Sequence, residues 1–385
     1  MNDLYNRYRA CRPTCLVALV LTCLSASASA SASASASASP SIAEANHLSS
    51  AVSWNLHLSL EGIDNFSGGI APGAVGNATA RAGFAFNTSR AGWWTGGRFV
   101  AQFLAIQNGN PENYVGDTQG VNAFTGLNRG ALYQLYYRQN IDNATLRAGL
   151  ISANNYFDST GVASDFLNVS YGFGSAMGIN VPGASSYPFS SLGVMGSYSA
   201  DGWTGMAGIF EGDAIHPFRD PTHRGNMIWL EADKSGSLGD GKYTVKVGGW
   251  RNRQLPQYQA MLGNDTSGMY TTGEYRWEMD GMDWGSFLEF EAAPNPVNSL
   301  PWYMGAGLRL KHFWAVRPRD SAGIGMARAW LRGAPYNAET DFEGYYSARI
   351  VRRLYLQTDL QYVVHPSAIY PNALVGIVRL HVTFS

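Results

Sequence analysis

The chain has little charge, no excess of basic residues and no long apolar run in its body. Asp, Glu, Lys and Arg make up 14% of the 385 residues, against about 25% in an average soluble protein. The formal net charge of -1 excludes the basic surface expected of a nucleic-acid-binding protein. Beyond the N-terminal region no apolar stretch reaches the length of a membrane-spanning helix, so none is predicted.

Cysteine is scarce and lies only near the N-terminus. The three cysteines are Cys11, Cys15 and Cys23. If the segment that holds them is removed, the remaining chain has no thiol. We therefore predict no disulfide framework, no cysteine nucleophile and no metal bound by cysteine.

Residues 1–40 have the pattern of a secretory signal peptide followed by a Ser-Ala low-complexity tail. Three arginines precede an apolar stretch at residues 15–24, and a Ser-Ala alternation follows at residues 25–39. This alternation offers many small-residue cleavage sites, so we predict export with cleavage near residues 28–45. The domain that remains is predicted to be residues 41–385.

Glycine and aromatic residues are abundant where charge is not. There are 44 glycines, aromatic residues reach 13%, and the mean hydropathy is -0.14. Few charges, many glycines and neutral hydropathy together are typical of a transmembrane β-barrel, whose strands are apolar on one face only. A chain this rich in aromatic residues is not expected to be disordered.

Polar and apolar residues alternate with a period of two along much of the chain. Residues 54–61 place Trp54, Leu56, Leu58 and Leu60 on one face and four polar side chains on the other. In residues 133–138 the same rule assigns Tyr133 to the apolar face. The alternation predicts strands with two unlike faces, and it recurs at residues 79–87, 98–103, 146–150, 288–291, 354–362 and 374–384.

Turn dipeptides separate these runs, notably Asp201-Gly202, Asp240-Gly241 and Asp280-Gly281. At roughly 20 residues for each strand and its connection, the body of the chain accommodates on the order of 16 strands. We therefore predict an all-β fold, a transmembrane antiparallel β-barrel of about 16 strands. A barrel of that size encloses water, which assigns the polar face to the lumen. A soluble β-sandwich would also alternate, but its outward face would carry more charge.

Several stretches resemble the carbohydrate-selective porins of the OprB family. The resemblance rests on GLISANNYFD at residues 149–158, DFLN at 165–168 and YPFSSLGV at 187–194. It continues in RPRD at 317–320 and is clearest in LQTDLQYV at 356–363. Other matching positions are Ala292 to Pro294, Glu339, Glu343, Tyr345, Tyr346 and Pro366. The resemblance extends, with gaps, from about Leu58 to Phe384.

The resemblance implies an outer-membrane porin for passive diffusion of monosaccharides and other carbohydrates into the periplasm. The chain departs from the family pattern at Leu150 and Ser152, where relatives carry a polar residue and then an acid. Sugars present hydroxyl groups around apolar ring faces, so a selective lumen needs arginines, acceptors and aromatic rings in weak, shared contacts. The residues predicted by alternation to line the pore and contact sugar are Arg81, Arg98, Gln102, Gln134, Arg138, Arg147, Glu289, Glu291, Glu343, Arg349, Gln357, Asp359, Gln361 and Arg379.

The predicted partners are small sugars in the lumen, outer-membrane lipids around the barrel and the barrel-assembly machinery, in the bacterial outer membrane. We predict no cofactor, no metal and no nucleic-acid partner. The mixture of Arg and carboxylate in the predicted lining argues against a strongly ion-selective pore. Porins are often trimers, whereas the resemblance favours a monomer, and the sequence leaves both states open.

Other functions fit the sequence less well. A general porin, or one for polyols or organic acids, has the same alternation. A barrel enzyme acting on sugars or lipids could use Glu289 and Glu291, whose Cα atoms would lie about 6.5–7 Å apart on one strand. A structural barrel with a plugged lumen is a third alternative. No G-x-S-x-G motif supports a serine hydrolase. The acids near His216 and His223 match no metal-ligand spacing and indicate a polar extracellular loop.

Overall fold

The computed structural model describes residues 51–125, 128–181, 183–219, 225–255, 259 and 265–385. The predicted signal peptide and its cleavage region lie outside the described residues, as does His223. In the described part of the chain, the strands are β1 (Val52–Ser67), β2 (Gly73–Asn87), β3 (Gly97–Gln107), β4 (Arg129–Ile141), β5 (Ala144–Ile151), β6 (Ser191–Ala200), β7 (Trp203–Glu211), β8 (Asn226–Leu238), β9 (Gly241–Arg253), β10 (Asp265–Met279), β11 (Met282–Ala292), β12 (Trp302–Lys311), β13 (Ser321–Trp330), β14 (Ala338–Val351), β15 (Leu354–Val364) and β16 (Ala373–Phe384).

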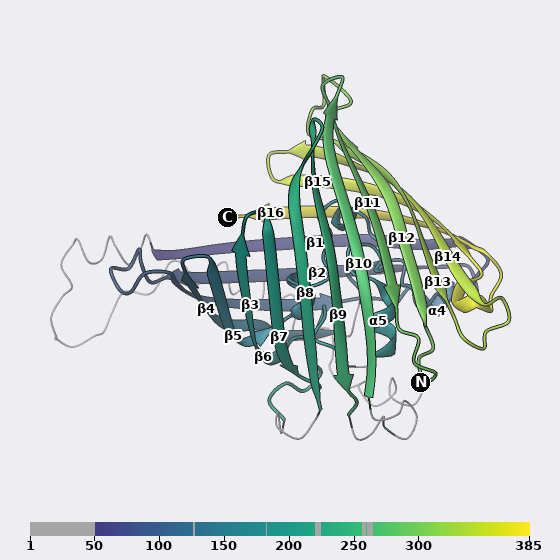
Figure 1. Ribbon diagram of the computed structural model, residues 1–385. Helices are drawn as coiled ribbons and strands as arrows, with labels where there is room; N and C mark the ends of the chain where they lie inside the picture. The colour runs from purple at the N-terminus through teal and green to yellow at the C-terminus, as the bar shows by residue number, and fades with distance from the viewer. Residues whose placement is uncertain (1–50, 126–127, 182, 220–224, 256–258, 260–264) are drawn as a thin grey trace, which may run out of the picture. The chain divides into compact units, whose positions relative to one another are not determined.

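Sixteen described strands form a closed barrel in which each strand pairs with its neighbours in sequence, and β1 pairs with β16 (Figure 1). All pairs are antiparallel, so the predicted fold is confirmed. Short connections gather at one end, where Asp201, Gly202, Asp280 and Gly281 all have positive φ. Two residues with positive φ match the twist of a hairpin, which explains the Asp-Gly dipeptides.

The opposite end carries the long connections, and short helices occur there. The described helices are α4 (Glu112–Val115), η2 (Ala153–Asn155), η3 (Ala163–Asp165), α5 (Ser175–Asn180) and η4 (Pro366–Ala368). Among the described residues, none of these helices is long or apolar enough to cross a membrane.

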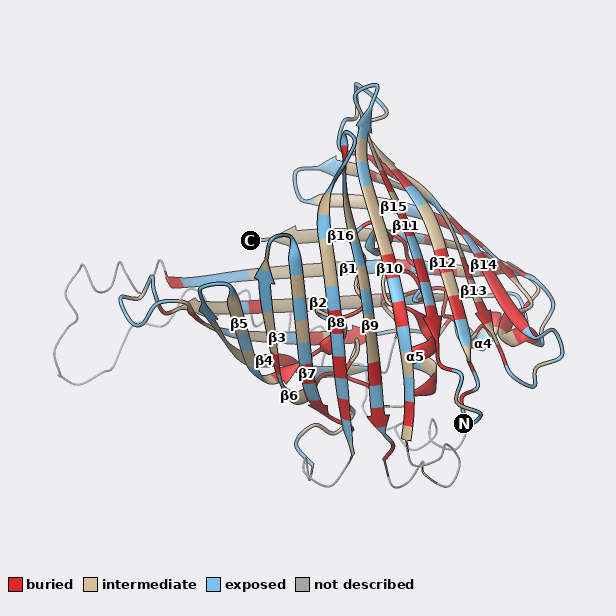
Figure 2. Ribbon diagram, in the orientation of Figure 1, coloured by how far each residue is buried: buried red, intermediate tan, exposed pale blue. Residues whose placement is uncertain are grey.

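Exposure alternates along the strands, as the sequence pattern predicts (Figure 2). In β11, Leu288 and Phe290 are exposed whereas Glu289 and Glu291 are each 2% exposed. The exposed side chains are apolar, and a wall that is apolar outside and polar inside suits a barrel surrounded by lipid.

The predicted outward orientation of Tyr133 is wrong. The residue was expected on the apolar outer face, but it is buried with Leu104 and Ile106. The register shifts between Gln102 and Phe103 of β3, so that Tyr133 of β4 has no opposite residue. A bulge of one residue reverses the side that the following residues face, and simple alternation does not reveal it.

The core lies inside the barrel and is built around the β5–β6 connection. We name the described residues 152–181 and 183–190 the inserted segment, because apolar side chains such as Phe157 and Phe166 are buried against the inner faces of several strands. Phe157 stacks on Trp229 of β8 with ring centroids 5.1 Å apart, and Phe166 packs against Phe287 of β11 and Tyr345 of β14. A segment that contacts β8, β11 and β14 of a closed barrel lies within it.

Candidate functional site

Six wall glutamates fix the connections that fold into the barrel, and we call them the anchoring glutamates. Each one accepts at least one hydrogen bond from a backbone N–H group of an inward-folded connection. They are Glu231, Glu274, Glu289, Glu291, Glu339 and Glu343. A buried loop needs partners for its backbone donors, and charged acceptors form the stronger hydrogen bonds.

The contact of Glu343 illustrates the arrangement. One carboxylate oxygen accepts from the N–H of Leu167 at 2.6 Å and the other from the N–H of Asn168 at 2.9 Å. Glu291 similarly accepts from the N–H of Ala176 at 2.7 Å, at the start of α5. Both carboxylates therefore hold the inserted segment in place through hydrogen bonds to its backbone.

Three of the predicted pore-lining residues belong to this set. Glu289, Glu291 and Glu343 lie on the inner face but are 2–3% exposed. Gln357 and Gln361 also hold connections, because their amides donate to the carbonyls of Asp165 and Val121 respectively. The structure thus gives these five side chains contacts with protein backbone, and contact with sugar stays a prediction for them.

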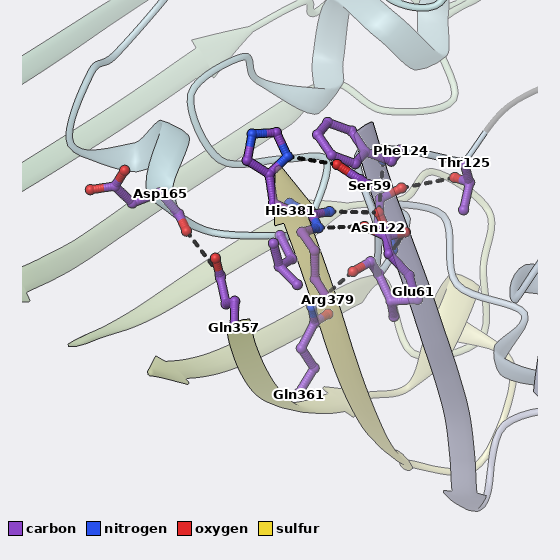
Figure 3. Close-up of polar contacts among 12 residues, drawn as sticks. Ser59, Glu61, Asn122, Phe124, Thr125, Asp165, Gln357, Gln361, Arg379 and His381 are labelled. Carbon is purple, nitrogen blue, oxygen red and sulfur yellow. Dashed lines mark hydrogen bonds and ion pairs between the residues drawn. The ribbon is translucent and has the colours of Figure 1, made fainter. Parts of the chain in front are cut away.

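Arg379 of β16 lies where the β3–β4 connection meets the barrel wall (Figure 3). Its guanidinium forms an ion pair with Glu61 of β1 and donates to the side-chain oxygen of Asn122 at 3.2 Å. The guanidinium carbon also lies 4.0 Å from the centre of the Phe124 ring. The contacts of Asn122 and Glu61 orient the guanidinium while its flat face packs on the ring.

A series of neighbouring aromatic rings extends from Phe124 to β4. Phe124 lies 6.3 Å from Tyr187 of the inserted segment, and Tyr187 lies 6.0 Å from Tyr133, measured between ring centroids. Arg129 packs over Phe189, 4.9 Å from its centroid. We call Phe124, Tyr187, Arg129 and Arg379 the aromatic-arginine site.

Of this site, the sequence analysis predicted Arg379 alone. Phe124, Tyr187 and Arg129 were missed because they lie on connections or at a strand start, where alternation carries no information. The YPFSSLGV match drew attention to the Tyr187 stretch but did not assign a role to it.

Three of the predicted pore-lining residues lie side by side on adjacent strands, namely Arg98, Arg138 and Arg147. Arg138 of β4 is directly opposite Arg98 of β3 and Arg147 of β5. Each is partly exposed, and none forms an ion pair with a carboxylate of the described residues. We call them the arginine row; Arg81 of β2 is likewise without an ion pair within the described ranges.

The remaining predicted residues are dispersed. Gln134 donates to Gln102 across β3 and β4 at 2.7 Å. Asp359 is buried in β15. Arg349 lies by the β14–β15 turn and donates to the carbonyl of Arg352 at 2.6 Å.

Acidic side chains gather at two further places, one between the β3–β4 connection and β14 and one on the β7–β8 connection. Asp117, Glu339 and Asp341 are buried, with carboxylate oxygens within 4.8 Å of one another, a geometry that could hold a cation. Glu339 also accepts hydrogen bonds from the N–H groups of Thr118 and Gln119. The cluster therefore also fixes the β3–β4 connection to β14. His216 contacts Asp213 at 3.3 Å.

Burial shifts the acidity of carboxyl groups on the inward-folded connections. Burial raises the pKa of Asp158 to about 6, and the nearby Glu231 carboxylate adds to the effect. Burial also raises the pKa of Asp117 well above its usual range, together with the charges of Glu339 and Glu112.

A closed barrel of sixteen described antiparallel strands, apolar outside and narrowed by inserted connections, defines the porin class of outer-membrane channel. Comparison with families of known proteins then identifies the particular family. The family model of the carbohydrate-selective porins, OprB family, matches residues 78–257 and 234–384. The chain belongs to this family and is a sugar-transporting outer-membrane porin.

Solved structures agree with the fold. The high-pH structure of Pseudomonas putida OprB superposes with a TM-score of 0.78 at 18% identity, covering 88% of this chain and 96% of that one. The low-pH structure of the same protein gives 0.61 at 16% identity, covering 88% and 95%. An anion-selective porin from Comamonas acidovorans gives 0.55 at 10% identity, covering 86% and 99%. No curated protein matches the chain in sequence.

Proposed function

We propose that this porin conducts monosaccharides passively across the bacterial outer membrane into the periplasm, and that sugars contact the aromatic-arginine site on the way. The observation that supports the proposal is the packing of Arg379 on Phe124, beside Tyr187. A ring and a guanidinium at one place match a ligand that has both apolar faces and hydroxyl groups.

The chemistry of each group suits weak recognition. Aromatic rings offer an apolar surface for the C–H face of a pyranose ring, and a guanidinium is a planar set of donors for hydroxyl oxygens. Arg81, which has no ion pair with a described carboxylate, lies opposite His57 of β1 and Leu104 of β3 and adds further donors to the wall. Contacts shared among several groups hold a sugar long enough to select it and still release it.

The anchoring glutamates support selection by size. A connection held by backbone hydrogen bonds to buried carboxylates keeps a fixed position in the lumen, so the pathway beside it has a constant width. A rigid constriction favours monosaccharides over disaccharides, and it needs no cofactor or chemical step.

Liposome swelling with the refolded protein tests the proposal. Glucose, a disaccharide, a neutral amino acid of similar size and a polyol are compared. Swelling that favours glucose beyond its size supports a sugar-selective channel. Rates that follow molecular size alone would reduce it to a general porin, and no swelling by folded protein would overturn the proposal.

A further inference from the structure

Three buried carboxylates meet where the β3–β4 connection contacts the start of β14. Asp117 lies on the connection, and Glu339 and Asp341 lie two residues apart on β14, so both point to the same face of the strand. Their carboxylate oxygens lie within 4.8 Å of one another. The three residues are 8%, 0% and 0% exposed, respectively, so bulk water does not screen their charges.

Glu339 accepts hydrogen bonds from the backbone, and this distinguishes it from the other two acids. The N–H groups of Thr118 and Gln119 donate to its two oxygens, each at 2.8 Å. The N–H group of Ser367, in the β15–β16 connection, donates to the same carboxylate. Glu339 therefore has donors for its charge, and it holds two connections against β14.

The other two acids have oxygens without a donor. Neither carboxylate oxygen of Asp117 has a hydrogen-bond partner among the described residues. The N–H groups of Asp117 itself and Gly120 lie nearby, but neither forms a hydrogen bond with the carboxylate. Asp341 accepts from the Asn168 amide at Oδ2, whereas its Oδ1 has no donor. Buried polar atoms are nearly always paired, so three such oxygens in one cluster indicate a ligand.

The cluster also has no basic partner in the described part of the chain. No Arg, Lys or His residue there forms an ion pair with any of the three acids. Glu112 of α4 is close enough to Asp117 to add a further negative charge. Like charges repel strongly where water is excluded. A bound cation removes this repulsion and provides a partner for all three oxygens.

The type and spacing of the ligands fit calcium. Ca²⁺ binds carboxylate oxygens at about 2.3–2.6 Å, so two oxygens on one ion lie no more than about 5.2 Å apart. All pairs in the cluster fall within this limit. Ca²⁺ also takes six to eight oxygen ligands, which leaves places for backbone carbonyls and water, whereas Mg²⁺ requires shorter bonds and keeps several of its waters.

We propose that Asp117, Glu339 and Asp341 bind one Ca²⁺ ion, which fixes the β3–β4 connection to β14. The site lies at the end of the barrel with the long connections, which faces the outside of the cell in barrels of this kind. Asp117 is more than 200 positions from the two acids of β14. This is why the sequence analysis, which depends on the spacing of ligands, predicts no metal.

The ion acts on the same connection that carries part of the aromatic-arginine site. Asn122 and Phe124 follow Asp117 on this connection and contact Arg379 of β16. With the ion bound, the connection is held both at β14 and at β16. Without it, two buried carboxylates repel each other at the first of these points, and the connection opens more often. The inference does not depend on which solute the lumen carries.

Isothermal titration of CaCl₂ into the metal-free, refolded full chain tests the site. The protein is kept in an uncharged detergent, and MgCl₂ is titrated separately. We expect one Ca²⁺ per chain with a Kd of about 10⁻³ M or tighter, and Mg²⁺ binding that is about tenfold weaker or more. Chymotrypsin cleavage after Tyr114 or Phe124 is a second readout, and we expect Ca²⁺ to slow it severalfold.

Two neutral variants test the ligands. Asp117 accepts no hydrogen bond from the described residues, and Asp341→Asn keeps an oxygen for the Asn168 amide, so Asp117→Asn and Asp341→Asn are both expected to fold. Each should weaken Ca²⁺ binding about tenfold or more and remove the protection from chymotrypsin. Asp283→Asn is the matched control, because Asp283 pairs with His312 at the other end of the barrel. Heat-modifiable gel mobility verifies folding.

The outcomes distinguish a calcium site from a cluster of acids that share protons. Ca²⁺ binding that both variants weaken and the control retains supports the inference. A folded native protein that binds no Ca²⁺ at about 10 mM overturns it, as does native affinity in either folded variant. Equal affinity for Ca²⁺ and Mg²⁺ overturns the assignment to calcium. Glucose swelling is measured on the same preparations, so a failure of the proposed function is seen separately.

Discussion

The guanidinium carbon of Arg379 lies 4.0 Å from the centre of the Phe124 ring. This contact joins the last strand to a connection more than 250 positions earlier in the chain. A cation over an aromatic face is stabilised by the charge distribution of the ring, so the two side chains keep a fixed mutual position that a passing sugar meets.

Removal of the ring is expected to weaken size selection. In Phe124→Ala the aromatic surface over Arg379 is lost and the pathway widens. We expect the disaccharide-to-glucose ratio of swelling rates to rise severalfold while the barrel stays folded. Phe342→Ala, on the exposed outer face at 47% exposure, serves as the control. An unchanged ratio in Phe124→Ala would remove this ring from the selective pathway.

Loss of one anchoring glutamate is expected to loosen the inserted segment. Glu343→Gln replaces one acceptor oxygen with an amide NH₂ that faces the N–H of Leu167 or Asn168. A buried donor left without an acceptor costs about 1–3 kcal/mol, so the segment should become sensitive to protease while the barrel persists. Limited proteolysis measures this, with the exposed Glu278→Gln as the control. Equal resistance in both variants would show that the contact does not hold the segment.

Asp158 is expected to make stability depend on pH. Its pKa is raised by burial to about 6 from the usual 3.8, so the folded state binds more protons than the unfolded state between these values. Its contribution to stability therefore falls as the pH rises from about 4 to about 6. Asp158→Asn removes this titration. Heat-modifiability midpoints measured across that range should fall less in the variant, and parallel curves would refute the assignment.

Gly149 is expected to be required for the pairing of β4 and β5. Its φ is +137°, and a Cβ atom there would lie 2.3 Å from the carbonyl oxygen of Leu135 and 2.7 Å from the Cα of Tyr136. Backbone atoms cannot yield as a flexible side chain does, so Gly149→Ala should cost about 2 kcal/mol or more. Gly205→Ala, where no atom lies within 4 Å, is the control. Equal midpoints of heat-induced unfolding would contradict this account.

The wall of the barrel could be predicted from the sequence because a strand's side chains alternate by geometry alone. Residues 288–291 are one such case, because Leu288 and Phe290 are exposed whereas Glu289 and Glu291 are buried. The Asp-Gly turns could also be predicted, because this dipeptide favours the positive φ values of a two-residue hairpin turn. Tyr133 shows the limit, since a one-residue bulge changes the facing and depends on the pairing with β3.

The interior could not be predicted to the same extent. Glu291 and Arg138 both face inward, but the first holds α5 through the N–H of Ala176 whereas the second has no carboxylate partner among the described residues. Alternation gives the side of the wall and not the depth or the partner. Phe124 and Tyr187 meet only through long-range folding of two connections, which local patterns do not encode.

The central claim is that sugars contact the aromatic-arginine site while they pass. The most direct measurement is the initial rate of labelled glucose entry into proteoliposomes as a function of glucose concentration, in the native protein and in Phe124→Ala. A site that binds sugar predicts a rate that saturates in the native channel and becomes closer to linear in the variant. A strictly linear rate in the native channel would contradict the claim and leave a pore that selects by size alone.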